Sequence, residues 1–148
     1  MNILLDTNIL ARMAQPGHSH HQAALDATDA LGLRGDVPCL VPQVLYEFWV
    51  VATRPLDVNG LGWTPDAARE EVTSLLAQFP LLEDTPAIFP HWLNLVSRGI
   101  SGKRVHDVRL QAVMLAHEIT HLLTFNIGDF PAVEGITVVH PNEIAPAG

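Results

Sequence analysis

The sequence predicts an α/β protein: a three-layer α/β/α sandwich in which helices cover both faces of a parallel sheet. Short apolar runs such as residues 2–5 end abruptly at turn-forming residues, as buried parallel strands do. Segments with a helical spacing of apolar residues separate these runs, so strands and helices alternate along the chain. The 148 residues, 48% hydrophobic and 16% charged, suit one domain with a substantial core. We expect residues 1–140 to form it and 141–148 to be a C-terminal tail.

Capping and turn residues predict the order of the elements. Ser19 caps a helix running to about Leu33, Pro42 suits the first turn of the next helix, and Thr64 opens a third. The expected later helices are 43–53, 64–78, 86–97 and one from about 107. The expected strands are 2–5, 37–41, 121–125 and 136–139, with a further candidate at 81–82.

Composition and charge limit the cellular compartments and the classes of partner that the sequence allows. No apolar run approaches the ~20 residues that span a bilayer, and the start lacks the basic segment of a signal peptide. The single cysteine, Cys39, excludes an internal disulfide, and we expect a cytoplasmic protein. A net charge of −8 argues against nucleic-acid binding, although four of the eight cations fall within residues 98–109.

Acidic residues follow two of the predicted strands. Asp6 comes directly after the first strand, and Asp129 lies shortly after the strand 121–125. Ligands of open α/β sheets bind beyond the carboxyl ends of the strands, so both acids are expected at one edge. An Asx turn with Thr7 and Asn8 is the simpler explanation of Asp6 alone, but a second acid at a second strand end favours a site.

Two further acids stand where a structural role competes with a functional one. Glu47 has nearly all apolar neighbours, and a buried carboxylate needs a cation or strong donors nearby. An ion pair with Arg54, Arg104 or Arg109 is one explanation, and a metal ion is the other. Asp107 stands at the expected start of a helix, where N-capping alone explains an Asp. The presence of the other three acids favours the interpretation that Asp107 belongs to a functional site.

Carboxylate oxygens are ligands that Mg²⁺ and Mn²⁺ prefer, and these ions keep several waters that exchange with substrate phosphates. One such ion, or two spaced ~3.5–4 Å apart, activates a water and stabilises the leaving oxygen of an in-line displacement. Asp6, Glu47, Asp107 and Asp129 together therefore indicate metal-dependent hydrolysis of phosphodiesters.

The same residues resemble a known family, the PIN domain, and within it the VapC-type ribonuclease toxins of toxin–antitoxin pairs. Four short motifs carry the resemblance, in order, along residues 2–139. They are Asp6-Thr7-Asn8 after an apolar strand, Glu47 in an apolar helix, Asp107 heading a helix, and Thr124-Phe125-Asn126-Ile127-Gly128-Asp129-Phe130.

The resemblance implies a fold, an activity and partners. It implies a parallel five-stranded sheet, an Mg²⁺ or Mn²⁺ cofactor, and endoribonuclease cleavage of single-stranded RNA that leaves 5′-phosphate and 3′-hydroxyl ends. It assigns metal binding to Asp6, Asp107 and Asp129, with Glu47 completing the acidic quartet directly or through water. A small antitoxin protein and a second copy of the chain in a homodimer are the implied partners.

Residues beside the acids have supporting roles in the same resemblance. Thr7, Asn8 and Thr124 would orient the acids. Many family members carry a further acid at the position of Asn126, whose amide forms hydrogen bonds but supplies no charge. A PIN-like module that binds RNA without cutting it therefore stays open as an alternative function.

A group of cations precedes and overlaps the segment around Asp107. It consists of Arg98, Lys103, Arg104 and Arg109. We expect these side chains to contact the RNA backbone, and an ordinary solvated loop is the alternative.

A rival motif is His117-Glu118-Ile119-Thr120-His121, which fits the H-E-x-x-H pattern of zinc peptidases. That pattern needs one helix through both histidines and a third ligand downstream. Here the chain turns towards strand character at the second histidine, so we interpret the match as accidental and keep the zinc peptidase as an alternative. We interpret His18, His20 and His21, at a loop-to-helix junction without cysteine, as solvated polar residues.

Overall fold

The computed structural model of the protein describes residues 1–144, and the last four residues of the expected tail lie outside this range. Within it the strands are β1 (Asn2–Leu5), β2 (Val37–Cys39), β3 (His121–Leu123) and β4 (Thr137–Val139). The α-helices are α1 (Thr7–Met13), α2 (His21–Leu33), α3 (Pro42–Thr53), α4 (Pro65–Gln78), α5 (Ile88–Val96) and α6 (Arg104–Ala116). Short 3-10 helices are η1 (Leu56–Val58), η2 (Ile127–Asp129) and η3 (Pro141–Glu143).

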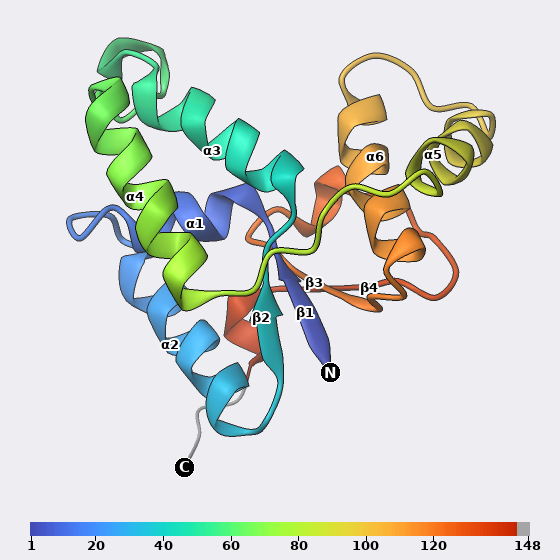
Figure 1. The fold of residues 1–148 in the computed structure, drawn as a ribbon, viewed down its shortest axis with the longest axis horizontal. Coiled ribbons are helices and arrows are strands. Elements are labelled where there is room, and N and C mark those ends of the chain that lie inside the picture. The colour runs from blue at the N-terminus through green and yellow to red at the C-terminus, as the bar shows by residue number, and fades with distance from the viewer. Residues whose placement is uncertain (145–148) are drawn as a thin grey trace.

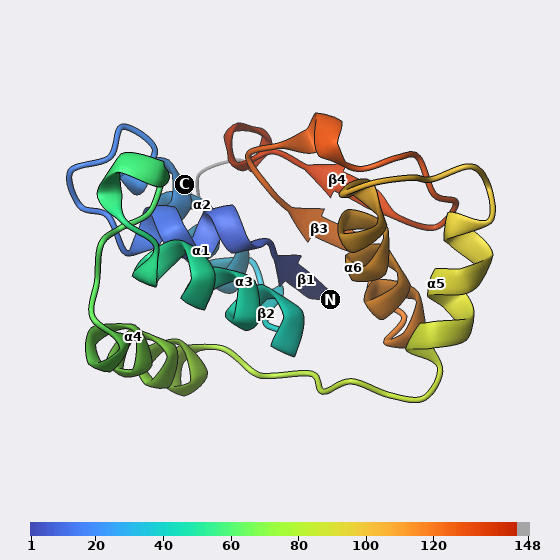
Figure 2. The same cartoon turned by 90° about the horizontal axis from the view of Figure 1, so that it is seen from above.

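The four strands form one parallel sheet in the order β2-β1-β3-β4. Helices α1 and α2 lie on one side of it and α5 and α6 on the other (Figures 1 and 2). Helix α3 packs against α1, and α4 packs against α3. The arrangement confirms the predicted α/β class and parallel sheet, and it brings the carboxyl ends of β1 and β3 side by side at one edge.

A five-stranded sheet was expected, and the structure corrects this to four strands. The candidate segment forms a single parallel bridge, Leu40 to Leu81, in which the Leu40 N–H donates to the Pro80 carbonyl at 2.9 Å. Extending a parallel ladder beyond this bridge needs the N–H groups of positions 38, 42 and 80. All three are prolines, which have no N–H to donate, so the pairing stops after one bridge.

Two helices near the strand ends differ from expectation. Helix α1 begins directly after Asp6, although no helix was expected before Ser19. It has only seven residues, too few for a periodic pattern to be recognised. Helix α6 begins at Arg104, three residues before the expected start at Asp107. Other ends shift by a few residues: α2 begins at His21, α5 at Ile88, and β3 ends at Leu123.

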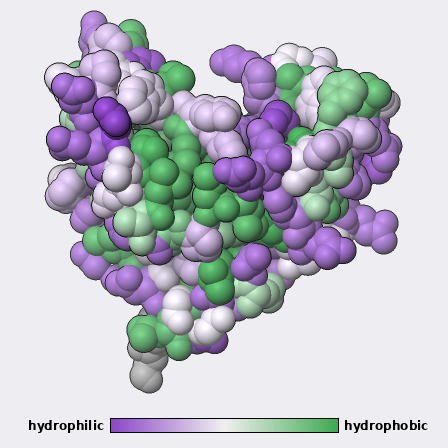
Figure 3. All heavy atoms as spheres, viewed as in Figure 1, coloured by the Kyte–Doolittle hydropathy of each residue, from purple (hydrophilic) through white to green (hydrophobic). Residues whose placement is uncertain are grey.

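The core lies on both sides of the sheet. Leu4 and Leu122 from the central strands and Phe48 from α3 are fully buried. Hydrophobic residues also reach the surface between α4 and the α5–α6 pair, where they show in green in Figure 3. None of the helices within residues 1–144 is both long enough and apolar enough to cross a membrane.

Truncating a central core side chain tests this packing. Leu122→Ala removes a fully buried side chain from β3, and we expect the free energy of unfolding in urea to fall by about 2–5 kcal/mol. Leu33→Ala is the matched control because that side chain is 77% exposed at the end of α2, and its effect is expected within about 0.5 kcal/mol. Equal losses for the two variants would contradict the described core.

Candidate active site

Asp6 stands where β1 ends and α1 begins, and it joins the ends of two strands. Its own N–H donates to the Leu123 carbonyl of β3 at 3.0 Å. Its carboxylate accepts from the Thr7 N–H at 2.7 Å through Oδ1 and from the Thr124 hydroxyl at 2.8 Å through Oδ2. The side chain thus serves as the N-cap of α1, which is the local explanation that an Asx turn anticipated. The capping role accounts for Oδ1. The other oxygen, Oδ2, accepts from Thr124, which belongs to the segment that follows β3.

The surroundings of Asp6 disfavour its charge. The residue is only 8% exposed, and burial raises the pKa of its carboxyl from 3.8 to about 6. The hydrogen bonds from Thr124 and Thr7 act in the opposite direction, and the negative charges of Glu47 and Asp107 add to the increase in pKa. A buried acid whose charged neighbours are also acids is a typical functional site, because a stable core does not need it.

Thr124 connects the segments that follow β1 and β3. Its hydroxyl donates to Asp6 and accepts from the Asn8 amide at 2.9 Å and from the Asn126 N–H at 3.1 Å. One donor and two acceptors are all that a hydroxyl offers, so this buried group is fully satisfied. The Asn8 side-chain oxygen accepts in turn from the Phe125 N–H at 3.1 Å. The geometry gives Asn8 and Thr124 the positioning contacts that the sequence led us to expect.

Glu47 is held by polar neighbours and not by an arginine. The Thr7 hydroxyl donates to one of its oxygens at 2.9 Å, and the Gln43 amide donates to the other at 3.0 Å. Arg109 reaches it only indirectly, donating to the Gln43 oxygen at 2.8 Å. Within residues 1–144 no ion pair joins Glu47 to Arg54, Arg104 or Arg109, so the structural explanation by an ion pair is wrong.

Asp107 and Asp129 approach from the far side of the sheet edge. Asp107 is half-buried in the first turn of α6 and does not cap the helix, so the alternative explanation by N-capping does not hold. Partial burial and the charges of Asp129 and Glu47 raise the pKa of Asp107, against the opposing charges of Arg104 and His106. Asp129 is exposed at the end of η2.

One cavity brings these residues together. It has a volume of about 480 Å³, and Asp6, Glu47, Asp107 and Asp129 all line it. It opens near the notch that Figure 3 shows between the side with α3 and α4 and the side with α5 and α6. The supporting residues Thr7, Asn8 and Asn126 line it as well. Thr124 is buried and reaches the cavity through Asp6.

Further lining residues come from α1, from the segment that follows it and from the residue that caps the end of α3. Arg12, Gln15, His18 and Arg54 line the same cavity. The sequence analysis did not assign Arg12 or Gln15 to a site. The signal for Arg12 is its spacing of four residues from Asn8, which places these two on one face of a helix, whereas Gln15 lies beyond the end of α1. That signal is useful only once residues 7–13 are known to be helical.

The donor set suits a hydrated divalent cation. Among residues 1–144, no three His, Cys, Asp or Glu side chains stand close enough together to enclose a metal ion. Mg²⁺ does not need such a cage, since it binds through one or two carboxylates and keeps several waters. No ion pair within this range neutralises any of the four acids, and their mutual repulsion is what a bound cation would relieve.

The four cations expected to contact RNA lie in different places. Arg98 lines a separate hollow with His91 and Glu134. Arg109 pairs with Asp84 at 3.4 Å and with Gln43. Lys103 and Arg104 are exposed at the start of α6, beside the cavity wall that carries Asp107.

The zinc-peptidase geometry does not form. Helix α6 ends at Ala116, and Glu118 has a φ of 58°, so the helix cannot continue to His121, which instead begins β3. The His117 ring lies 2.7 Å from the Glu83 carbonyl. The two histidines are therefore not on one helical face, as the interpretation of an accidental match predicted.

His18, His20 and His21 are exposed or partly exposed, as interpreted, but two of them also have specific contacts. The His20 ring stacks on Phe125 with centroids 4.7 Å apart and planes 9° apart. His140 meets the edge of the same ring at 5.4 Å. His18 lines the acidic cavity, and burial together with the nearby Arg12 lowers its pKa. Of these rings, only His18 lines the acidic cavity.

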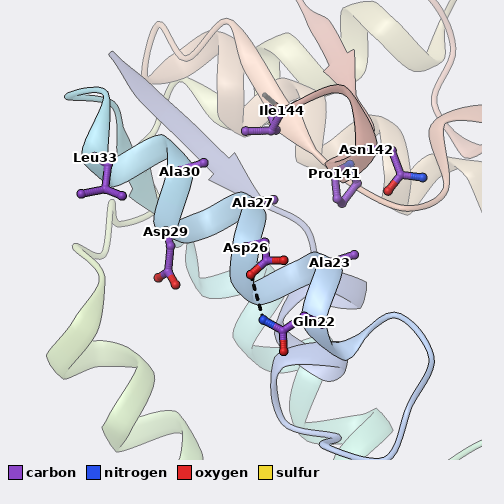
Figure 4. Close-up of a pocket in the computed structure, with 10 residues that line it drawn as sticks. All are labelled: Gln22, Ala23, Asp26, Ala27, Asp29, Ala30, Leu33, Pro141, Asn142 and Ile144. Carbon is purple, nitrogen blue, oxygen red and sulfur yellow. Dashed lines mark hydrogen bonds between the residues drawn. The ribbon is translucent and has the colours of Figure 1, made fainter. Parts of the chain in front are cut away.

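A larger hollow of about 640 Å³ lies elsewhere, between α2 and η3 (Figure 4). Its wall is formed largely by Ala23, Ala27 and Ala30 of α2. Its polar side chains Gln22 and Asp26 are hydrogen-bonded to each other at 2.8 Å. The hollow offers surface for contact but no convergent reactive groups, so size alone does not identify the site.

Comparisons with known proteins agree with this geometry. A family model described as the PIN domain matches residues 3–136. VapBC2 from Rickettsia felis, bound to a DNA fragment from its promoter, superposes with a TM-score of 0.69 and 15% identity over 95% of this chain and 98% of that one. FitAcB from Neisseria gonorrhoeae gives 0.68 and 20% over 95% and 99%. VapC20 from Mycobacterium tuberculosis, described as a sarcin-ricin loop cleaving toxin, gives 0.58 and 19% over 81% and 86%. At these identities the structures show the shared fold alone, and no curated protein matches in sequence.

The raised pKa of Asp6 predicts how stability depends on pH without metal. The folded state holds the proton more tightly, so stability is highest below the ordinary pKa of 3.8 and is lost as pH rises through about 6. We expect Asp6→Asn to remove this loss. In EDTA, the free energy of unfolding of the variant relative to that of the wild type should therefore rise by up to about 3 kcal/mol from about pH 4 to about pH 7.

Urea unfolding at a series of pH values measures this difference. Asp29→Asn, the same change at an exposed position of α2, is the control and should follow the wild-type profile. Parallel profiles for Asp6→Asn and wild type would contradict the described burial of Asp6.

Proposed function

The chain belongs to the PIN-domain family, and from this premise we propose that it is a metal-dependent endoribonuclease that hydrolyses phosphodiester bonds of single-stranded RNA. The observation that carries the proposal is the cavity lined by Asp6, Glu47, Asp107 and Asp129, with no ion pair to any of them within residues 1–144. Acids gathered without counter-charges are costly to a folded protein and suit the binding of a cation with a phosphate.

The proposal gives each acid a task. Asp6, Asp107 and Asp129 would hold a hydrated Mg²⁺ or Mn²⁺ at the sheet edge, one or two of them directly and the others through its waters. When bound, the cation activates a water and neutralises charge on the phosphodiester. Glu47 is fixed through both of its oxygens, by Thr7 and Gln43, and acts on the site directly or through water.

We further propose that the protein is the toxin of a toxin–antitoxin pair and acts in the cytoplasm. Support comes from the structural neighbours, which include VapBC2 and the FitAcB structure. A small antitoxin protein is the proposed partner, and a homodimer is the proposed assembly. Exposed apolar residues on α3, Tyr46 at 67% and Val50 at 56%, offer surface for either contact. A short open reading frame adjacent on the genome would support the pairing.

Cleavage of RNA is the direct test. We expect purified protein to cut a single-stranded RNA with Mn²⁺ or Mg²⁺, leaving 5′-phosphate ends, and EDTA to stop it. Asp6→Asn is expected to lower the rate at least ~10²-fold, because it removes a charge that holds the cation. Glu118→Gln is the matched control and should cut like the wild type, since Glu118 lies beyond the end of α6.

The outcomes separate the alternatives. Loss of activity in Glu118→Gln, with stoichiometric zinc and peptide cleavage, would replace the nuclease with the peptidase. Wild-type protein that binds RNA but never cuts it would support a binding module.

Asn126, an uncharged residue at the cavity, gives a second prediction. Asn126 lines the cavity at the position where many family members carry an acid. Asn126→Asp supplies that charge, and we expect the Mn²⁺ concentration for half-maximal cleavage to fall by roughly tenfold. Asn94→Asp, the same change at an exposed position of α5 outside the cavity, is the control and should leave it unchanged. A higher metal requirement in Asn126→Asp would show that this position does not take part in metal binding.

A further inference from the structure

Two of the chain's eight cations line the acidic cavity itself. They are Arg12, in the last turn of α1, and Arg54, directly after α3. Neither forms an ion pair within residues 1–144, and neither is among the groups that shift the pKa of Asp6 or Asp107. These arginines are therefore not counter-charges that stabilise the acids.

Arg12 is oriented but not neutralised. Its Nη1 donates to the Gln15 side-chain oxygen at 2.6 Å, a neutral acceptor two residues beyond the end of α1. Asn8 lies one turn before Arg12 on the same face of α1, so the guanidinium lies on the same wall as the residues that position Asp6. The remaining donors of the guanidinium fork are available to a ligand in the cavity.

Arg54 is fixed by the loop that follows it. Its Nη2 donates to the Asn59 carbonyl at 3.0 Å. Gly60 packs so closely on the Arg54 backbone that an added Cβ would lie 1.9 Å from the Arg54 carbonyl oxygen, so only glycine fits at this position. The Nε–H is buried and has no hydrogen-bond partner in the described part of the chain. A guanidinium without an ion pair, held at a cavity wall, is suited to binding two oxygens of an anion such as phosphate.

We propose that Arg12 and Arg54 bind phosphates of the RNA strand next to the bond that is cut. This inference rests on the proposed nuclease function. The four acids repel an RNA backbone, and a metal ion compensates only the phosphate that it contacts. Neighbouring phosphates of a strand lying in the cavity need cations of their own. Guanidinium groups match phosphate oxygens in charge and geometry.

The test measures RNA binding by arginine variants in a background that is expected not to cut RNA. Asp129→Asn serves as the background so that a fluorescently labelled single-stranded RNA stays intact with Mg²⁺ present. In this background Arg12→Gln and Arg54→Gln are each expected to weaken binding about tenfold in anisotropy titrations and to lower the salt slope by about 0.7. Arg69→Gln, an identical change at an exposed position of α4 outside the cavity, should bind like the background.

Kinetics and conservative variants give an independent readout. With Asp129 restored, the Arg→Gln variants should raise KM more than they lower kcat, because they remove binding and leave the acids in place. Arg12→Lys should recover part of the affinity, since it keeps the charge but not the fork. Thermal melting checks folding, and Arg12→Gln decides the matter if Arg54→Gln disturbs its loop.

Failure of this inference is distinguishable from failure of the proposed function. If wild-type protein cuts RNA while both arginine variants bind like Arg69→Gln, the inference is wrong and the nuclease stands. If the variants bind RNA normally but no longer capture the antitoxin, the arginines recognise a protein partner and the inference is again wrong. If wild-type protein neither binds nor cuts RNA with any divalent cation, both fall.

Discussion

The carboxylate of Asp6 is the contact on which the site depends. Its two oxygens accept hydrogen bonds from Thr7 and Thr124, residues 117 positions apart that stand at the ends of β1 and β3. Parallel pairing of β1 with β3 brings these ends together, and the buried Thr124 hydroxyl, saturated by Asn8 and Asn126, prevents them from separating. Glu47 is attached to the same centre through the Thr7 hydroxyl. One hydrogen-bonded unit therefore positions two acids and the loop that leads to a third.

The same unit explains why the site is charged and still tolerated. Hydrogen bonds from Thr7 and Thr124 favour the carboxylate form of Asp6, yet burial and the neighbouring acids outweigh them and raise its pKa to about 6. A protein selected for stability alone would place an arginine among these acids. Here the arginines of the cavity bind neutral partners, Gln15 and a backbone carbonyl, and remain oriented toward the open space. The acids and arginines of the cavity have no ion pairs within the described residues. They are therefore available to bind a cation and a phosphate from solution.

Prolines and short helices give the fold its particular shape around the site. The prolines at positions 38, 42 and 80 reduce a fifth strand to one bridge, so the sheet ends at β2. Helix α3 then starts at once, with Pro42 in its first turn, and carries Gln43 and Glu47 along one face over the sheet edge. On the opposite side α6 begins three residues earlier than its sequence suggests, which places Asp107 inside the first turn and directs it at the other acids. The likeness to toxin structures at 15–20% identity shows that such a frame persists where little sequence does.

The sequence by itself determined the α/β class and the parallel strands, because apolar runs that end at turn-forming residues report strand ends directly, and it singled out the four acids that line the cavity. It also exposed the H-E-x-x-H match as accidental, since the residues after it favour a strand. Tertiary structure alone decided what those acids touch. Glu47 had three candidate arginines and is bound by Thr7 and Gln43 instead. Arg12 became a cavity residue only once the seven-residue α1 was seen, because so short a helix is stabilised by packing and by its Asp6 cap and not by a periodic pattern. Patterns along a chain record which side chains are buried. Which polar partner each one meets depends on how distant segments pack.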